Sequence, residues 1–261
     1  MDELKQKHRA LWALGDYPAV AADLIPSLGP VLVEACRIRP GQRVLDVAAG
    51  TGNVAIPAAL TGADVVASDL TPSLLAAGEK LAAERGATLD WREADAEDLP
   101  FESDAFDVVV SCVGVMFAPH HRAAADELVR VARPGGTIGL ISWTPEGFIG
   151  QLFATLKPFV PPPPPGVSPA PLWGSPSHVA ELFGDRVTDL TAERRTVRVD
   201  AFATGASFRE YFTTVYGPTI VALRGTDRPD ELRRALDELG DRWLTGGAME
   251  WEYLLSTATV C

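Results

Sequence analysis

The chain has 261 residues, of which 47% are hydrophobic and 22% charged, so a sizeable core is expected and disorder throughout is excluded. The formal net charge is −12 at pH 7, and Lys and Arg never form a run longer than two residues. Because phosphate contacts supply most non-specific nucleic-acid affinity, this charge balance argues against a nucleic-acid partner.

The spacing of the cysteines and the length of the apolar segments indicate the cellular compartment of the protein. Cys36, Cys112 and Cys261 lie far apart and form neither a disulfide framework nor a metal-ligand spacing. The N-terminus lacks the apolar core of a signal peptide, and no stretch approaches the roughly eighteen apolar residues of a membrane helix. We therefore expect a soluble, cytoplasmic protein with no metal and no membrane partner.

The first forty residues are predicted to be helical in two pieces. Residues 15–18 break the helical spacing, and Pro26 and Pro30 interrupt the second helix, which covers 19–36. Trp12 and Tyr17 precede the first predicted strand, so both are candidates to fold over a ligand, Tyr17 on a cofactor and Trp12 on a substrate. Packing on the core is an equally good interpretation of both rings.

From Arg43 the apolar pattern alternates between short buried runs and amphipathic segments, which is typical of an α/β fold with a parallel sheet. The predicted strands are 43–47, 64–68, 88–92, 106–112 and 137–142, and the helices between them are 53–60, 72–85 and 122–131. Thr71 and Pro72 give the second of these helices an N-cap and a proline at its first position. The sequence Arg-Pro-Gly-Gly at 133–136 predicts a stop after the third.

The remainder of the chain changes character. It predicts helices at 147–156, 177–183, 208–223 and 229–244, strands at 186–199 and 249–260, and a stiff spacer at the five prolines 161–165. We predict four segments: an N-terminal helical cap (1–40), a cofactor-binding core (41–143), a lid and substrate-binding insertion that includes the strand near 186–199 (144–247), and a C-terminal strand that completes the sheet (248–261).

The strongest local signal is the sequence Val-Leu-Asp-Val-Ala-Ala-Gly-Thr-Gly-Asn at 44–53. It predicts a buried strand, a turn of small residues, and a helix that begins near Asn53 as its N-cap. Small residues let a ligand approach the backbone closely, and such a turn sits at the carboxyl edge of an α/β sheet, where ligands bind. We interpret it as a nucleotide-type cofactor loop.

Two carboxylates narrow the ligand to one that contains adenosine. Asp69 ends the next strand, where it can accept hydrogen bonds from both hydroxyls of a ribose. Asp95 follows the third strand, where it can accept from the adenine amine, with Ala96 offering backbone contacts. Residues 50–55 also fit the dinucleotide fingerprint, so an NAD-dependent oxidoreductase remains an alternative, although it leaves the segment 95–100 unexplained. Asp46 is buried in the first strand and needs a partner, which a cationic ligand would supply.

Four motifs together resemble the class I S-adenosylmethionine-dependent methyltransferases, most closely the ubiquinone/menaquinone-biosynthesis-like branch and its actinobacterial relatives. They lie at 44–53, 67–71 (Ala-Ser-Asp-Leu-Thr), 95–100 (Asp-Ala-Glu-Asp-Leu-Pro) and 131–136 (Val-Ala-Arg-Pro-Gly-Gly). The resemblance covers residues 4–143 well and the rest in outline. It implies a Rossmann-like seven-stranded, mostly parallel sheet whose last strand, 249–260, is antiparallel, plus a helical lid, with S-adenosylmethionine as cofactor and S-adenosylhomocysteine as product.

The resemblance also assigns cofactor residues. It places Asp46, Ala48, Gly50 and Gly52 along the methionine moiety, Asp69 on the ribose, Leu70 beside the adenine, Asp95 and Ala96 on the adenine, and Ser111 or Cys112 at the close of the pocket. Many relatives carry Gly where this chain has Ala48, which is tolerated if the φ angle of that residue is negative. The motifs do not extend to a catalytic residue.

Methyl transfer needs a general base only if the nucleophile must lose a proton. His120 and His121 are the candidates, and capping of the helix that begins near Arg122 is the competing interpretation of His120. The predicted substrate-binding residues are Trp12, Met116, Phe117, Trp143, Phe148, Tyr211 and Tyr216, which suggest an apolar or aromatic small-molecule acceptor. A third hypothesis is a protein that keeps the cofactor without methyl transfer. A homodimer is compatible with the sequence, which does not determine the oligomeric state.

Overall fold

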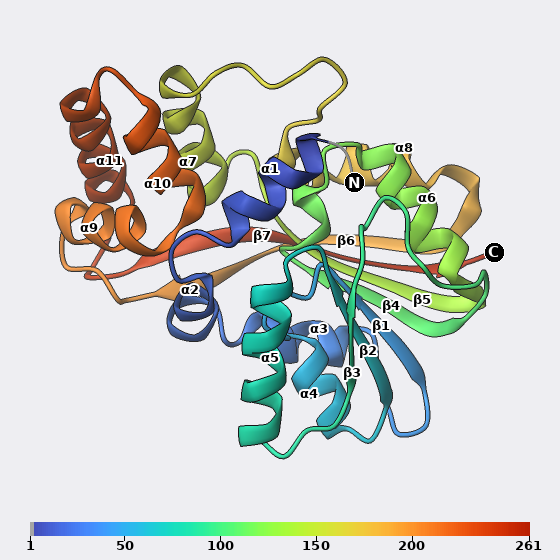
Figure 1. Cartoon of the computed structure of the whole chain (residues 1–261). Coiled ribbons are helices and arrows are strands. Elements are labelled where there is room, and N and C mark those ends of the chain that lie inside the picture. Colours follow the sequence, from blue (N-terminus) through green and yellow to red (C-terminus); the bar gives the residue numbers. More distant parts are fainter. Residues whose placement is uncertain (1–2) are drawn as a thin grey trace. The chain divides into compact units, whose positions relative to one another are not determined.

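The computed structural model describes residues 3–261 and contains the predicted alternation of strands and helices (Figure 1). The strands are β1 (Arg43–Val47), β2 (Asp64–Asp69), β3 (Asp90–Glu93), β4 (Phe106–Cys112), β5 (Ala132–Trp143), β6 (Val187–Val199) and β7 (Met249–Val260). The α-helices are α1 (Glu3–Trp12), α2 (Tyr17–Leu24), α3 (Leu28–Ala35), α4 (Ala55–Leu60), α5 (Pro72–Glu84), α6 (His121–Val131), α7 (Phe148–Leu156), α8 (Pro176–Phe183), α9 (Gly205–Val215), α10 (Gly217–Gly225) and α11 (Pro229–Trp243).

The seven strands form one sheet in the order β3-β2-β1-β4-β5-β7-β6. Strands β1 to β5 pair in parallel with their neighbours, and β7 pairs antiparallel with β5. The central strand β4 is a run of buried valines, as expected for a parallel strand covered on both faces. The predicted Rossmann-like seven-stranded sheet with an antiparallel last strand is confirmed.

The chain divides into two compact units, and two of the boundaries between them fall within β6 and β7. Of the described residues, unit 1 contains 3–25, 145–165 and 196–252, and unit 2 contains 26–144, 166–195 and 253–261. The predicted segment boundaries near residues 40, 143 and 247 stay predictions. Most of β6, which was predicted within the insertion, is assigned to unit 2 with the sheet.

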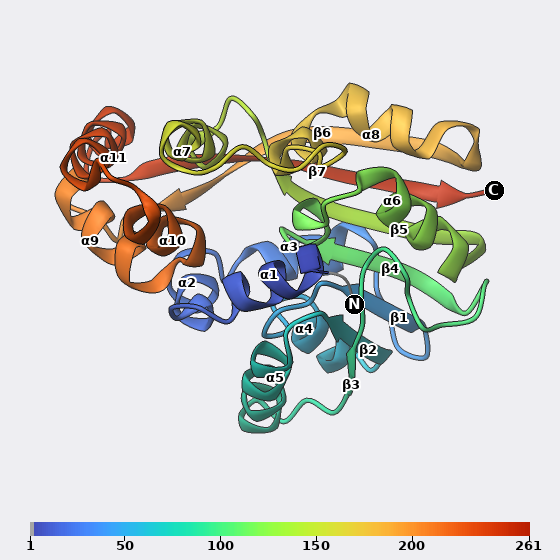
Figure 2. The same cartoon turned by 45° about the horizontal axis from the view of Figure 1, so that its top comes forward.

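Unit 2 is the layered α/β part. Helices α3, α4 and α5 cover one face of the sheet, and α6 and α8 cover the opposite face, as both views show (Figures 1 and 2). Helix α3 comes so close to the cofactor turn that a Cβ on Gly29 would overlap the backbone of Asn53. A glycine at this position therefore sets the distance between the helix and the turn.

Unit 1 is a group of helices around aromatic side chains. The ring of Phe148 in α7 stacks on Trp251, with ring centroids 5.1 Å apart, and meets Phe208 of α9 edge to face at 5.0 Å. Phe208 also lies 4.6 Å from Phe212, one helical turn further along α9. Burial of these large rings stabilises this unit. Among the described residues, no single helix is long and apolar enough to cross a membrane, and α2 and α3 pass that test only together, as a bent pair.

Several predicted boundaries are wrong for identifiable reasons. The N-terminal region forms three helices because Pro26 and the residues around it separate α2 from α3. The predicted helix 208–223 is two helices, since Gly217 and Pro218 follow Tyr216 and start a new one. Strand β3 begins at Asp90, two residues later than predicted. The Arg-Pro-Gly-Gly sequence lies inside β5, where the pairing with β4 is irregular.

Cys36 is a packing residue at the face of the sheet. Burial raises the pKa of its thiol to about 12, so the reactive thiolate is absent at neutral pH. A Cβ on Gly139 of β5 would overlap the Cys36 sulfur, with Leu32 of α3 close beside it at 3.2 Å. The α3–β5 contact therefore requires a residue without a side chain at position 139.

We expect Gly139→Ala to lower the free energy of unfolding by about 1–3 kcal/mol, because the added methyl group overpacks the α3–β5 contact. Cys36→Ala removes the atom that clashes, so the double variant should be more stable than the sum of the two single changes predicts. Urea unfolding of the four proteins measures this coupling. Additive single effects would show that the clash is relieved elsewhere.

Ala48 does not have the negative φ angle at which an alanine is tolerated at this position. Its φ angle is +55°, in the left-handed region that favours glycine. Gly114 packs against its carbonyl group, where a Cβ on Gly114 would overlap the Ala48 oxygen. The turn after β1 therefore contains a strained alanine.

We expect Ala48→Gly to raise the free energy of unfolding by about 1 kcal/mol, because the left-handed conformation costs an alanine roughly that much. Ala49→Gly is the matched control, since Ala49 is not among the residues with positive φ and should lose about 0.5–1 kcal/mol. Thermal unfolding of both variants tests the prediction. A loss of stability in Ala48→Gly equal to that in the control would contradict it.

Candidate functional site

The carboxyl ends of β1 and β2 meet at the turn 48–54, and the side chain of Asp69 lies against that turn. The backbone N–H of Gly50 donates to Asp69 Oδ2 at 2.8 Å, and that of Thr71 donates to Oδ1 at 2.8 Å. Burial raises the pKa of Asp69, and these backbone hydrogen bonds oppose the shift. Each carboxylate oxygen retains capacity to accept a further hydrogen bond, as binding of two ribose hydroxyls would require.

Asp46 is the more deeply buried carboxylate of the site, with 1% of its surface exposed. Its Oδ2 accepts a hydrogen bond of 2.9 Å from the backbone N–H of Ala55, the first residue of α4. Its Oδ1 has no hydrogen-bond partner within residues 3–261. Burial, with a smaller contribution from the nearby Asp69, raises the pKa of Asp46 to about 8. An unpartnered buried carboxylate oxygen favours a ligand that is cationic or donates hydrogen bonds.

Asp46, and not Asn53, caps the helix after the turn. The sequence predicted Asn53 as N-cap, but residues 51–54 form a turn and α4 begins at Ala55. A carboxylate from the preceding strand then satisfies one of the N–H groups that every helix leaves unpaired at its start. The anion also interacts favourably with the positive end of the helix dipole.

The turn itself requires glycine at two positions. Gly50 and Gly52 have φ angles of +56° and +83°, and with Ala48 they place every second residue in the left-handed region. The ring of Trp91 in β3 covers this turn, where a Cβ on Gly52 would lie 2.8 Å from Cη2 of the indole. The alternation gives the turn the shape of a nest of backbone N–H groups, in which the N–H of Gly50 binds the Asp69 carboxylate.

The predicted adenine-binding segment lies beside the ribose-binding position. The N–H of Ala94, directly after β3, donates to the backbone oxygen of Asp69 at 3.0 Å and joins the ends of β2 and β3. Asp95 accepts from the N–H of Glu97 at 3.0 Å, which orients its side chain in a local turn. Asp95, Ala96 and Leu70 are all half-buried, so each keeps some surface for contact with a ligand.

Ser111 has a structural role that the sequence did not indicate. Its hydroxyl donates to the backbone oxygen of Val47 at 2.6 Å and accepts from the N–H of Val115 at 2.8 Å. The side chain is fully buried and its donor is used, so the structure argues against a direct contact with the cofactor. The half-buried Cys112 keeps that possibility, although burial raises the pKa of its thiol well above the usual value.

His120 forms a pair with Glu97 from the adenine-binding segment. Its Nδ1 lies 2.8 Å from Glu97 Oε2, and its backbone N–H donates to Oε1 at 2.6 Å. The residue occupies the N-cap position of α6, as the competing interpretation proposed, but its side chain makes no capping hydrogen bond. If Nδ1–H donates to Glu97, Nε2 is left as an acceptor, which is the state a general base requires.

The structure argues against His121 as the base. Its Nδ1 lies 2.9 Å from Nε2 of His178, and its ring packs between His178 and Trp173 with centroid distances of 5.2 and 5.6 Å. Burial lowers the pKa of His121 to about 4, so it is a weak base at neutral pH. Its Nε2 and the Nε1 of Trp173 are buried without a hydrogen-bond partner in the part of the chain that the structure describes. This pair was missed because His178 follows 57 positions later.

The residues predicted to bind substrate separate into two groups by burial. Those that are buried, and so present no surface to a substrate in this conformation, are Met116, Trp143, Phe148 and Tyr216. Those that remain half-exposed are Trp12, Phe117 and Tyr211. Within unit 1, Trp12 meets Tyr17 and Tyr216 edge to face at 5.5 and 6.0 Å, so the structure brings these three rings together.

Comparisons with known proteins agree with this geometry. Residues 45–140, which include the cofactor turn, Asp69 and Asp95, match the family model described as a methyltransferase domain. An uncharacterized protein of Mycobacterium tuberculosis (strain ATCC 25618 / H37Rv) is 52% identical over 259 residues, covering 98% of this chain and 94% of that protein. A demethylmenaquinone methyltransferase of Clavibacter sepedonicus is 42% identical over 98 residues, covering 38% of this chain and 40% of that enzyme.

Solved structures share the fold at low sequence identity. The YcgJ protein of Bacillus superposes with a TM-score of 0.64 at 18% identity, covering 90% of this chain and 98% of that one. A geranyl diphosphate methyltransferase, solved in complex with S-adenosylmethionine, superposes with a TM-score of 0.55 at 16% identity, covering 90% and 85%. With the matching domain model and the named relative, these findings lead to one conclusion. Residues 45–140 of the chain belong to the methyltransferase-domain family.

Proposed function

We propose that this methyltransferase binds S-adenosylmethionine at the turn between Asp46 and Asp69 and transfers its methyl group to an apolar or aromatic small molecule. The observation that carries the proposal is the buried oxygen of Asp46 that has no partner among the described residues. Asp46 lies in β1, directly before the turn to which Asp69 is hydrogen-bonded. S-adenosylmethionine carries a sulfonium and an ammonium group against one carboxylate. Its net positive charge is what a buried carboxylate without a partner favours.

The residues of the site fit the parts of this cofactor. The two Asp69 oxygens are oriented by Gly50 and Thr71 and can each accept from one ribose hydroxyl. Asp95 is held in its local turn at the neighbouring strand end, where an adenine amine can donate to it. Trp91 and the glycines of the turn shape the backbone that the methionine part would follow.

Methyl transfer depends more on how the protein positions the two reactants than on reactive side chains. The sulfonium carbon of the bound cofactor is already activated toward in-line displacement. The protein contributes mainly by aligning the acceptor atom and excluding water, which together supply most of the rate. Where the acceptor must lose a proton, His120 is the base that the geometry favours, because Glu97 orients its ring and can stabilise the imidazolium.

The half-exposed aromatic residues support an apolar or aromatic acceptor. The match of residues 45–140 to the methyltransferase domain model favours methyl transfer over the NAD-dependent oxidoreductase. The protein that keeps the cofactor without methyl transfer stays a second candidate, because methyl transfer requires no particular side chain that could be found missing. A homodimer and a cytoplasmic location are further parts of the proposal.

We expect Asp69→Ala to weaken binding of S-adenosylmethionine and S-adenosylhomocysteine by about 10- to 100-fold, the effect of losing hydrogen bonds to a charged group. Asp64→Ala is the matched control, because Asp64 begins the same strand and is exposed. Calorimetric titration of the three proteins with both ligands and with NAD gives the answer. Equal binding by the two variants, or binding of NAD alone, would contradict the assigned site.

A transfer assay with labelled S-adenosylmethionine then separates the two remaining candidates. The acceptor panel consists of apolar and aromatic alcohols, amines and activated carbon acids. Label that reaches an acceptor with wild-type protein, and is reduced in Asp69→Ala at limiting cofactor, supports methyl transfer. Tight cofactor binding with no transfer to any class would favour the protein that retains the cofactor for another purpose.

The raised pKa of Asp46 makes cofactor binding pH-dependent. With a pKa of about 8 in the free protein, Asp46 is mostly protonated at neutral pH, and a cation bound beside it favours the ionised form. Binding should therefore release close to one proton, and affinity should rise from about pH 6 to about pH 8. Calorimetry in buffers of different ionisation enthalpy measures the release. The isosteric Asp46→Asn variant should bind more weakly and release less, and equal proton release in both would exclude Asp46 as the source.

A further inference from the structure

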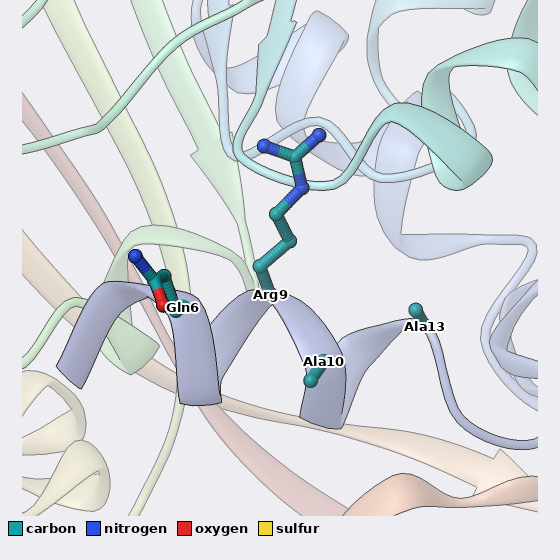
Figure 3. A pocket seen from close by; sticks show the side chains of 4 residues that line it. All are labelled: Gln6, Arg9, Ala10 and Ala13. Carbon is teal, nitrogen blue, oxygen red and sulfur yellow. The ribbon is translucent and has the colours of Figure 1, made fainter. Parts of the chain in front are cut away.

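Unit 1 has an open cavity along helix α1. Gln6, Arg9, Ala10 and Ala13 border this cavity of about 500 Å³ (Figure 3). None of the four residues is buried, so the cavity is a surface hollow and not an enclosed binding site. Unit 2, in contrast, holds a tightly packed tryptophan, Trp91, at the cofactor turn.

The indole of Trp91 in β3 lies between the cofactor turn and helix α5. A Cβ on Gly52 of the turn would lie 2.8 Å from Cη2 of the indole, and a Cβ on Gly78 of α5 would lie 2.5 Å from the same atom. Real Cβ atoms do not approach a ring so closely, because protein interiors are close-packed without overlap. The outer ring of the indole therefore occupies a space that exists only because both neighbours are glycines.

Gly78 is an unusual residue for its position. It is buried in the middle of α5 (Pro72–Glu84), where glycine makes a helix less stable than alanine does. A Cβ at this position would also lie 3.1 Å from the backbone carbon of Thr51, so α5 approaches the turn itself as well as the indole. The chain thus has a less stable helix at the point where α5, Trp91 and the turn meet.

The register of the sheet places Trp91 in one row with Asp46. Asp46 pairs with Ala67, and Ala67 pairs with Trp91, and the side chains of paired residues point to the same face of the sheet. Ala67 is small and fully buried, which leaves room for the indole to reach the turn. Three residues after Trp91, the N–H of Ala94 donates to the backbone oxygen of Asp69 at 3.0 Å, where the adenine-binding segment begins. Strand β3 therefore contacts the glycine turn through Trp91 and leads directly into the adenine-binding segment.

We propose that Trp91 is a positioning residue for the cofactor, which holds the glycine turn at a fixed distance from the adenine-binding segment. Trp91 acts through the backbone of the turn and is assigned no contact with the cofactor. Gly78 is its partner, because only glycine at this position leaves space for the indole. The inference rests on the proposed function, since it names the side chain that supports the proposed site.

The test measures binding of S-adenosylhomocysteine by calorimetry, at a temperature where circular dichroism shows every variant to be folded. Trp91→Phe removes the outer ring of the indole and should weaken binding about 10-fold, because the turn loses its support. Gly78→Ala should weaken binding by a similar factor, because the added methyl group overlaps the indole and displaces it. Adenosine lacks the methionine part that follows the turn, so both variants should lose less affinity for adenosine than for S-adenosylhomocysteine.

The double variant separates positioning from packing. In Trp91→Phe/Gly78→Ala the added methyl group takes up space that the indole has left, so binding should return to within about threefold of the wild-type affinity. Trp173→Phe is the matched control, because it makes the same substitution at a buried tryptophan of unit 2, in the 3₁₀ helix Ala170–Gly174, and should leave binding unchanged.

Three outcomes would overturn the inference. Wild-type affinity in both single variants would show that the indole only packs, and a double variant that binds no better than the single ones would show that the ring and the glycine do not act together. An equal loss of affinity in Trp173→Phe would show that the effect is not specific to the turn. Absence of S-adenosylhomocysteine binding by the wild-type protein would instead overturn the proposed function.

Discussion

Two carboxylates buried at a single turn are the constraint on which the rest of the site depends. Asp46 lies inside the sheet and Asp69 ends the neighbouring strand, and the charge of Asp69 makes ionisation of Asp46 harder still. The fold offsets this cost with backbone N–H groups from Gly50, Ala55 and Thr71. Three elements are thereby joined to the two acids: the glycine turn, the start of α4 and the approach to α5.

Among the described residues, one carboxylate oxygen of this pair, Asp46 Oδ1, has no hydrogen-bond partner. A protein under selection for stability alone would replace such a carboxylate with an apolar residue of similar size, because unpartnered buried charge is among the most costly features of a fold. Asp46 has a raised pKa in the free protein and would ionise beside a cation, so the cost of burying it is reduced when a cationic ligand binds. The carboxylate is best explained as part of a binding site and only secondarily as a helix cap.

Backbone strain gathers at the same edge of the sheet. Ala48 after β1 and Val113 after β4 both have φ near +50°, which for a β-branched residue is a true outlier. Each costs about 1–3 kcal/mol and persists only where the surroundings determine the conformation. Ser111 joins the end of β1 to the segment after Val113, and the N–H of Val113 donates to Ile141 at 2.7 Å. These hydrogen bonds preorganise the edge of the sheet before any ligand arrives.

The features that were predicted correctly are those whose sequence signal lies within a few neighbouring residues. The valine run of β4 and the Thr71–Pro72 start of α5 were located to within one residue, because each signal is complete within a few positions. The true cap of α4 comes from Asp46, nine residues earlier, so the locally better cap at Asn53 was preferred wrongly. The acceptor of the Ser111 hydroxyl, the backbone oxygen of Val47, lies 64 positions away, and no local pattern indicates it.

The acceptor is the least predictable feature for a related physical reason. An aromatic ring at helical spacing has the same pattern whether it fills a core, as Phe148 does, or borders a cavity, as the half-exposed Trp12 can. Burial separates the two cases, and burial depends on segments distant in sequence. Methyl transfer adds no side-chain requirement that would mark the acceptor site. Specificity in such an enzyme therefore depends on a few partly exposed rings, and it can change without altering any motif of the cofactor site.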